Sequence, residues 1–325
     1  MLIDSIFKIK SITDFEHLAI QIFNYQATNC SIYKCFLDHL KIDPQTIFTI
    51  KDIPFLPIEF FKSHTVLTST NTVELVFSSS GTTGTLTSKH HVSDVALYEK
   101  SYLKGFAHFY GNIEDYIVLA LLPSYLERQD SSLIYMVDDL IKLSKHSESG
   151  FFLKNHQKLA KKLKFLDKNG QKVLLIGVSF ALLDLVEKHS FNLKNTIIME
   201  TGGMKGRRKE LIRSEFHTVL SNGFGVSTIH SEYGMTELLS QAYSSSEGIF
   251  RTPPWMQVLV RDTEDALSIL PHQKTGGINI IDLTNINSCS FIATQDLGKT
   301  YADGTFEILG RFDNSDIRGC NLMVY

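Results

Sequence analysis

The chain lacks the features that mark membrane-spanning, secreted and metal-binding proteins. It has no apolar run of about eighteen residues and no basic leader followed by an apolar core. Four cysteines are too few for a disulfide framework, and the close pair Cys30 and Cys35 fits no common zinc spacing. The twelve histidines include no HExxH motif. We therefore expect a cytoplasmic protein with no membrane span and no transition metal.

A strong excess of charge of either sign is also absent, since the formal net charge is −3. A surface for nucleic acid or anionic lipid is normally strongly basic, so the charge argues against either as the main partner. The composition, 43% hydrophobic and 21% charged, is ordinary for a globular protein. A chain of 325 residues exceeds one minimal core, so we expect one large domain with subdomains, or two domains.

Apolar runs that alternate with amphipathic segments predict the fold class. Three runs are typical of strands covered on both faces: residues 115–122, 173–178 and 196–199. Helices are predicted before, between and after them, over residues 95–110, 131–145, 180–188 and 209–220. Ser93 or Asp94 would cap the first of these helices, and Gly111 would follow its end. The alternation predicts an α/β fold with a mostly parallel sheet.

Four polar clusters follow predicted strands, where ligands bind in open α/β sheets. The first is Ser78–Gly84, with five hydroxyl side chains and two glycines after the apolar run Val73–Phe77. Alone, it fits either a polar surface turn or a loop whose hydroxyls and backbone N–H groups bind a polyphosphate. It has neither the lysine of a Walker loop nor the GxGxxG spacing of a dinucleotide turn. The other clusters are Thr201–Arg208, Ser231–Glu237 after a short strand over 228–230, and Thr294–Gly298 followed by Gly310–Asp313.

Together these clusters resemble the motifs of the adenylate-forming superfamily, which contains acyl-CoA synthetases, luciferases and the adenylation domains of peptide synthetases. That superfamily has an SSGTTG loop, a YGxTE segment, a TGD segment and a GRxD segment in this order. The chain has Ser79–Gly84 (SSGTTG), Tyr233–Glu237 (YGMTE), Thr294–Asp296 (TQD, with Gln for Gly) and Gly310–Asp313 (GRFD). The resemblance covers about residues 55–320, nearly the whole chain.

Within the superfamily, the chain is most similar to the acyl-protein synthetases of the bacterial luminescence fatty-acid reductase system, and next to phenylacetate-CoA ligases. The similarity rests on residues 53–62 (IPFLPIEFFK), 124–128 (SYLER), 200–206 (ETGGMKG) and 317–320 (IRGC). It implies the large N-terminal domain of the adenylate-forming fold, with mostly parallel sheets flanked by helices, a small antiparallel β subdomain, and no C-terminal domain of the usual kind.

We divide the chain into four parts on these grounds. Residues 1–62 form a helical N-terminal segment that packs on the main body and ends near the proline-braced stretch Ile53–Ile58. Residues 63–250 hold the α/β subdomains with the phosphate loop. Residues 251–310 form the β subdomain, in which short strands are separated by turns, and residues 311–325 are a C-terminal hinge stub.

The resemblance also implies a role for individual residues toward ATP and Mg²⁺. The loop that cradles the β- and γ-phosphates would consist of Ser79, Ser80, Gly81, Thr82, Thr83 and Gly84. Thr236 would contact the α-phosphate, and Glu237 would hold Mg²⁺, a hard ion that prefers oxygen ligands. The remaining nucleotide or acyl contacts would come from Gly202, Gly203, Tyr233 (stacked on adenine), Gly234, Asp296 (on the ribose hydroxyls) and Arg311.

One catalytic group of the superfamily has no counterpart in this chain. Full-length relatives carry a lysine in a C-terminal domain that assists adenylation, whereas this sequence stops fourteen residues after Arg311. Another cation or a partner would then supply the charge, or adenylation would be slow. The candidate cations are Lys89, Arg128, Lys205 and Arg207, and the sequence does not choose among them; we carry Arg128 forward as a catalytic candidate.

The acyl acceptor is expected to be a thiol. Acyl-protein synthetases are similar in having a cysteine near the C-terminus that receives the acyl group, and Cys320 stands at the matching position. Arg318 would lower the pKa of that thiol. The alternative, a small apolar residue at a strand end, stays open because Cys289 is also present.

The function expected from the resemblance is ATP-dependent activation of a carboxylic acid, a fatty acid in the most similar family, followed by acyl transfer to a thiol. That thiol would belong to Cys320 and then to a partner protein, or to CoA. Two alternatives remain: an acyl-CoA ligase of the phenylacetate type, and a nucleotide- or acyl-binding subunit without turnover.

Overall fold

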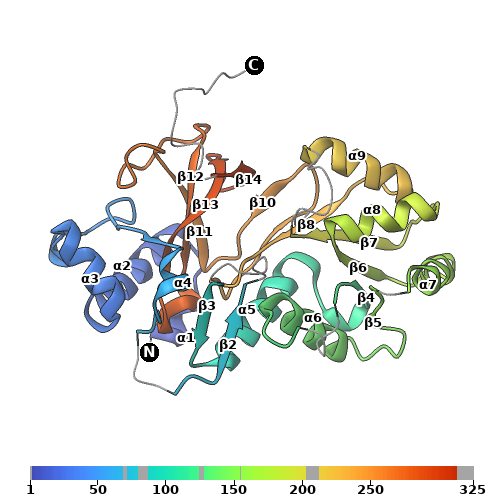
Figure 1. Ribbon diagram of the computed structural model, residues 1–325, viewed down its shortest axis with the longest axis horizontal. Coiled ribbons are helices and arrows are strands. Elements are labelled where there is room, and N and C mark those ends of the chain that lie inside the picture. The colour runs from blue at the N-terminus through green and yellow to red at the C-terminus, as the bar shows by residue number, and fades with distance from the viewer. Residues whose placement is uncertain are drawn as a thin grey trace.

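A computed structural model describes residues 2–68, 72–79, 87–123, 128–153, 155–202 and 212–312. Within these ranges a 12-stranded sheet crosses the molecule in the order β11-β12-β13-β14-β10-β9-β8-β7-β6-β4-β5, with β1 beside β13 (Figure 1). The strands β2 and β3 form a separate antiparallel hairpin. The α/β class that the alternating pattern predicts is thus confirmed.

The strands have the following bounds: β1 Leu56–Pro57, β2 Leu75–Ser78, β3 Lys89–Val92, β4 Ile117–Leu121, β5 Gly150–Phe151, β6 Val173–Val178, β7 Thr196–Thr201, β8 His230–Tyr233, β9 Ala242–Ser244, β10 Ile249–Arg251, β11 Met256–Arg261, β12 Gly276–Asp282, β13 Phe291–Thr300 and β14 Phe306–Arg311. The helices are α1 Leu2–Ile6, α2 Ile12–Asn29, α3 Ser31–Leu40, α4 Phe60–Ser63, α5 Val95–Tyr110, α6 Ser132–Leu143, α7 His156–Lys168, α8 Ser179–Lys188 and α9 Arg213–Phe224, with short 3₁₀ turns η1 Pro44–Thr46, η2 Ile113–Asp115 and η3 Leu283–Asn287.

The parallel half of the sheet consists of β5, β4, β6, β7 and β8. Every residue of β4 and β6 is buried, because helices cover both faces of these strands. Figure 1 shows α8 and α9 on one side of the strands and α5 and α6 on the other. The carboxyl ends of β7 and β8 therefore lie side by side, with Thr201 paired to Glu232.

The antiparallel half continues the same sheet from β9 through β10 and β14 to β11. The N-terminal helices pack on this half, so the first helices of the chain lie beside strands from its last part (Figure 1). Gln26 of α2 fixes them there: its side-chain amide donates to the carbonyl oxygens of Asn285 (2.9 Å) and Ile286 (3.0 Å) and accepts from Ser290 N–H (2.9 Å). The boundaries that we drew at 62, 250 and 310 stay predictions.

Predictions made from local signals agree well with the structure. The helix over residues 95–110 is confirmed, with the Asp94 side chain accepting from Leu97 N–H and Gly111 at φ 81° after its end. The strand over 173–178 is also confirmed. The helix α7 was not predicted, although Asn155 caps it and buried leucines recur at helical spacing.

Two of the polar clusters lie in strands rather than after them. Thr294–Gly298 falls inside β13, because β13 extends to Thr300 in order to pair with β14. Ser231–Tyr233 belongs to β8, whose start was predicted two residues too early at 228 instead of 230. The residues that follow β8, Gly234–Glu237, still lie after a strand. Asp296, within β13, lies opposite Arg311 of β14.

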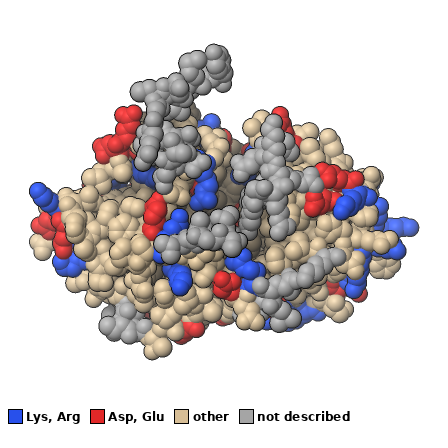
Figure 2. Space-filling view, in the orientation of Figure 1, with Lys and Arg blue, Asp and Glu red and all other residues tan. Residues whose placement is uncertain are grey.

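None of the helices in the described ranges is long and apolar enough to cross a membrane. Figure 2 shows basic and acidic side chains interspersed over the described part of one face, rather than gathered by sign.

Candidate functional site

The site is built on the segment Gly234–Gln241, which follows β8 and carries most of the YGMTE motif. Asp282, at the end of β12, is fully buried and anchors this segment. It accepts hydrogen bonds from the backbone N–H groups of Leu239 (3.0 Å) and Ser240 (2.8 Å) and from Ser240 Oγ (2.7 Å). Thr284 donates to it twice more, from N–H at 3.1 Å and from Oγ1 at 2.5 Å.

Two further side chains hold the same segment. Asn285 Nδ2 donates to the carbonyl oxygen of Glu237 at 2.8 Å. The ring of His90, on β3, contacts the carbonyl oxygen of Thr236 through Nδ1 and Ser288 Oγ through Nε2, both at 3.0 Å. A carbonyl oxygen only accepts, so Nδ1 carries the proton and Nε2 accepts from the hydroxyl. Burial lowers the pKa of His90 to about 4, which keeps the ring neutral.

The carboxyl group of Glu237 is buried at the end of the motif, with the residue 5% exposed. Burial raises its pKa, while a hydrogen bond from Ser88 and the charges of Arg311 and Lys62 act in the opposite direction. Glu237 is therefore a carboxyl group whose ionised form a further cation would stabilise.

Tyr233, Asp296 and Arg311 lie together, although their motifs are far apart in the sequence. The Tyr233 hydroxyl donates to Asp296 Oδ2 at 2.7 Å, and Arg311 Nε lies 3.3 Å from Asp296 Oδ1. Asp296 and Arg311 are cross-strand partners on β13 and β14, which explains why their two motifs meet. Burial raises the pKa of Asp296, against the hydrogen bond from Tyr233. The Tyr233 ring packs edge-on against Phe250 and Phe306.

A cavity of about 170 Å³ opens where β7 and β8 end. Four of the predicted site residues line it: Arg128, Gly202, Gly234 and Thr236. Arg128 Nε pairs with Asp130 Oδ1 at 3.2 Å. The apolar part of the wall comes from Tyr98, Leu133, Met136 and Met235, and its remaining polar part from Ser78, Ser131, Ser132, Thr201, Glu232 and Gln241.

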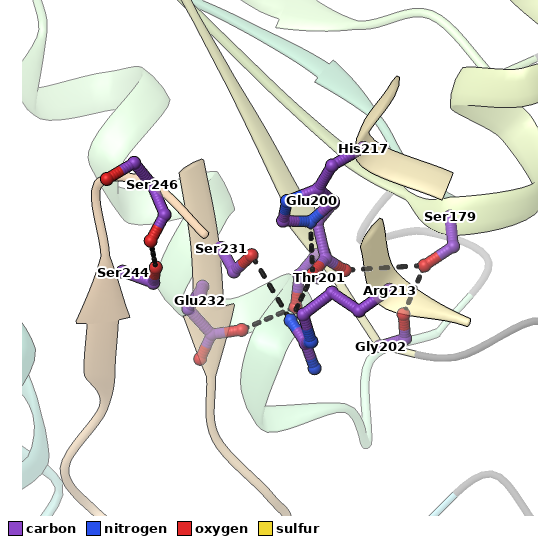
Figure 3. Close-up of polar contacts among 10 residues, drawn as sticks. All are labelled: Ser179, Glu200, Thr201, Gly202, Arg213, His217, Ser231, Glu232, Ser244 and Ser246. Atoms are coloured by element: carbon purple, nitrogen blue, oxygen red, sulfur yellow. Dashed lines mark hydrogen bonds and ion pairs between the residues drawn. The ribbon is translucent and has the colours of Figure 1, made fainter. Parts of the chain in front are cut away.

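Glu232 is a buried carboxyl group in the cavity wall that sequence reasoning missed. It accepts a short hydrogen bond from the Thr201 hydroxyl on the neighbouring strand (Figure 3). Figure 3 also shows Arg213 turned to Glu200, with Nη1 2.9 Å from Glu200 Oε1 and 3.4 Å from Ser231 Oγ. The arginine thus forms an ion pair with Glu200. Burial, together with the charge of Glu200, raises the pKa of Glu232 to about 7.

The raised pKa of Glu232 predicts a pH dependence of stability. The folded protein holds this proton more tightly than the unfolded chain, so the stabilisation is present at low pH and is lost as pH rises from 4.5 to about 7. At about pH 8 we expect Glu232→Gln to have a higher urea midpoint than the wild type, with a free energy of unfolding larger by up to about 3 kcal/mol. At about pH 5 the two proteins should differ little. Equal differences at both pH values would contradict the assignment.

Several predicted residues cannot be compared with the structure. The loop residues Ser80–Gly84, Gly203, Cys320 and the candidate cations Lys205 and Arg207 lie outside the described ranges. Ser79 is described, and its backbone N–H donates to the carbonyl oxygen of Ser88 at 3.0 Å. Lys89 is exposed at the start of β3 and does not line the cavity.

No group of three or more metal-ligating side chains occurs among the residues that the structure describes. Glu237 is thus a single carboxylate, a donor set that suits Mg²⁺ held jointly with phosphate oxygens better than a metal held by protein alone.

The residues that sequence reasoning missed differ in the signal they gave. Glu232 is a charged residue directly before the YGMTE motif, and a charge in a strand covered on both faces marks a site. Asp282 and His90 gave no such signal, because the groups of Gly234–Gln241 that they contact lie 42 to 146 residues away.

Comparison with known proteins gives one family and several structures. The family described as "Acyl-protein synthetase, LuxE" matches residues 10–325. A Vibrio harveyi protein named long-chain-fatty-acid–luciferin-component ligase is 23% identical over 323 residues, which cover 92% of this chain and 84% of that protein.

Among solved structures, ATP-bound MatB from Rhodopseudomonas palustris superposes with a TM-score of 0.55 and 19% identity, over 73% of this chain and 47% of that one. An open form of 2-hydroxyisobutyryl-CoA ligase gives a TM-score of 0.67 at 10% identity, over 94% and 72% of the two chains. The chain spans about half the length of MatB. These structures confirm the predicted fold, that of the large domain of adenylate-forming enzymes.

Proposed function

Because the chain belongs to the acyl-protein synthetase (LuxE) family, we propose that it is an ATP-dependent ligase that activates a carboxylic acid and transfers the acyl group to a thiol. In the first step, a carboxylate oxygen attacks the α-phosphorus of ATP, an acyl–phosphate bond forms, and pyrophosphate leaves. In the second, a thiolate attacks the acyl carbon, a thioester forms, and AMP leaves with the electron pair.

The observation that carries this proposal is the cavity at the carboxyl ends of β7 and β8. It brings Arg128, Gly202, Gly234 and Thr236 to one wall, although they come from three separate parts of the sequence. Adenylation needs little covalent help, since holding two polar substrates in line supplies most of the acceleration. A rigidly anchored segment, as Gly234–Gln241 is, suits that task.

Individual residues would act as follows. Thr236 would contact the α-phosphate, and Asp296 would accept hydrogen bonds from the ribose hydroxyls. The Asp296 carboxylate would then accept from the ribose and from the Tyr233 hydroxyl at the same time. Arg128, in the cavity wall, would face the negative charge that builds up around the α-phosphorus. Ser79–Gly84 would bind the outer phosphates.

Mg²⁺ would be held by Glu237 together with the phosphates. The buried carboxyl group, whose pKa is raised by burial, fits this role because a cation beside it restores the ionised form. When bound, Mg²⁺ would neutralise part of the phosphate charge. The protein's own contribution is to hold the Glu237 main chain through Asn285.

The acid is proposed to be a fatty acid, since the Vibrio harveyi relative is named for a long-chain fatty acid. The test is ATP–pyrophosphate exchange over a panel of carboxylic acids. Acid-dependent exchange is expected. Formation of free acyl-CoA from acid, ATP and CoA would instead favour the acyl-CoA ligase. Tight ATP binding without any exchange would favour a non-catalytic subunit.

The acyl acceptor is proposed to be Cys320. Two of the described cysteines are poor alternatives, since burial raises the pKa of the thiols of Cys30 and Cys289. Cys35, on α3, is exposed. A low thiol pKa and access are what acyl transfer needs.

We predict that Cys320→Ser abolishes stable acyl labelling of the protein while leaving pyrophosphate exchange within about 3-fold of the wild type, because exchange precedes the thiol step. The measurement is hydroxylamine-sensitive retention of radioactive acid on the denatured protein. Cys35→Ser is the matched control and should keep its label. Label retained on Cys320→Ser but lost from Cys35→Ser would reverse the assignment.

A further inference from the structure

The cavity wall holds one buried acceptor that nothing in the described chain satisfies and a buried carboxyl group. Gln241 is 6% exposed, and its buried Oε1 has no hydrogen-bond partner among the described residues. Glu232 is 8% exposed, and the donor that the described residues offer it is the Thr201 hydroxyl, which bonds to Oε2. A buried acceptor without a donor is costly, so Gln241 Oε1 beside this cavity indicates a ligand that brings a donor, and the Glu232 carboxyl group lines the same wall.

The contact with Gly234 fixes where the Glu232 carboxyl group lies. Oε1 lies against Gly234: a Cβ at that glycine would come within 2.4 Å of it. Gly234 itself lines the cavity. The absence of a side chain there is therefore what leaves room for the carboxyl group beside the ligand.

No internal cation competes for Glu232 within the described residues. Arg213 is taken by Glu200 on the adjacent strand, at 2.9 Å. Arg128 lines the same cavity but pairs with Asp130. The wall thus offers a carboxyl group and an amide oxygen to the ligand at one place and a guanidinium group at another.

The rest of the wall limits the ligand to a partly apolar molecule. Tyr98, Leu133, Met136 and Met235 contribute apolar surface, and the Tyr98 hydroxyl is already used, donating to Ser132 O at 2.9 Å. The volume of about 170 Å³ is below the range of about 300–1,000 Å³ of most ligand pockets, so the described walls enclose only a short stretch of chain.

We propose that this cavity binds the acyl portion of a carboxylic acid that carries a hydrogen-bond donor, a hydroxyl or an ammonium group, and that Glu232 receives that donor. The inference rests on the proposed function and specifies its substrate class. An unsubstituted acid of the same length would leave Gln241 Oε1 without a donor and would offer Glu232 none besides the Thr201 hydroxyl, and it would be rejected on that ground. Glu232 is then a specificity-determining residue.

The experiment compares straight-chain acids of several lengths in unsubstituted, hydroxylated and aminated forms. We measure kcat/KM in ATP–pyrophosphate exchange for the wild type, Glu232→Gln and Glu232→Leu. The wild type is expected to favour a hydroxylated or aminated acid over its unsubstituted form by at least about 10-fold. Glu232→Leu should abolish that preference.

The Glu232→Gln variant distinguishes an acid that carries a hydroxyl group from one that carries an ammonium group. An amide oxygen still accepts from a hydroxyl, so a preference for hydroxylated acids should survive Glu232→Gln within about 3-fold, whereas a preference for aminated acids should fall by at least about 10-fold with the charge. Glu264→Gln, at an exposed turn, is the matched control and should change neither preference.

The outcomes decide between this inference and the proposed function. Exchange that favours unsubstituted acids, or a donor preference unchanged in Glu232→Leu, overturns the inference and leaves the function standing. If no acid supports exchange, the function fails, and calorimetric binding of the same acids to the wild type and Glu232→Leu tests the cavity alone. Donor-bearing acids that bind no better than unsubstituted ones would then overturn the inference.

Discussion

Replacing Glu237 by glutamine is expected to lower the rate of ATP–pyrophosphate exchange by about 10²–10³-fold, the usual loss when one fixed group that stabilises the transition state is removed. The substitution keeps the size of the side chain and removes only its negative charge. Because the residue is 5% exposed and burial raises the pKa of its carboxyl group, the neutral amide should fold at least as well as the acid.

The Mg²⁺ dependence separates this role from a structural one. If Glu237 holds the ion, the Mg²⁺ concentration for half-maximal exchange should rise in Glu237→Gln, while circular dichroism and the urea midpoint stay close to those of the wild type. The exposed Glu264→Gln variant should match the wild type in all three measurements. Exchange that survives Glu237→Gln at the wild-type rate would remove the metal assignment.

Replacing Asp282 by alanine is expected to destabilise the protein by about 3–5 kcal/mol, because it leaves several buried donors without an acceptor. Asp282 accepts from the N–H groups of Leu239, Ser240 and Thr284 and from the hydroxyls of Ser240 and Thr284, and of these the Leu239 N–H keeps a second acceptor in Asn285 Oδ1. Urea denaturation of the wild type and the variant gives the difference directly.

An exposed turn in the same half of the molecule offers the control for this prediction. Asp265 also accepts from a backbone N–H, that of Leu267 at 3.1 Å, and from a hydroxyl, that of Ser268 at 2.5 Å. Water replaces these bonds when Asp265 becomes alanine, so we expect a much smaller loss of stability than in Asp282→Ala. If the two variants lost the same stability, the anchoring role of Asp282 would be wrong.

The sequence was a good guide wherever the determining contacts are local. Asp94 and Gly111 mark the two ends of α5 through interactions within a few residues. The apolar run of β6 reflects burial of both faces of that strand. The extent of β13 was missed because it depends on pairing with β14. Local polarity at Thr294–Gly298 suggested a loop, and the cross-strand hydrogen bonds outweighed it.

Residues of the candidate site could be predicted from the sequence where they belong to a recognisable motif, and not elsewhere. Tyr233, Asp296 and Arg311 were expected together from the order of the motifs, although 63 residues separate Tyr233 from Asp296. His90 and Asp282 hold the segment Gly234–Gln241 through long-range contacts that no local sequence pattern predicts. Glu232 gave a signal, a charge in a covered strand, that points to a site without revealing which ligand it serves.

The bonds of Gln26 have a consequence for how the protein is made. They tie α2 to Asn285, Ile286 and Ser290, and Asn285 in turn holds the carbonyl group of Glu237. During synthesis on the ribosome, therefore, the first helices wait without their partners until some 259 further residues have been added. Contacts of such long range form late in folding. A nascent chain would therefore not hold the main chain of Glu237 in place until Asn285 has been added.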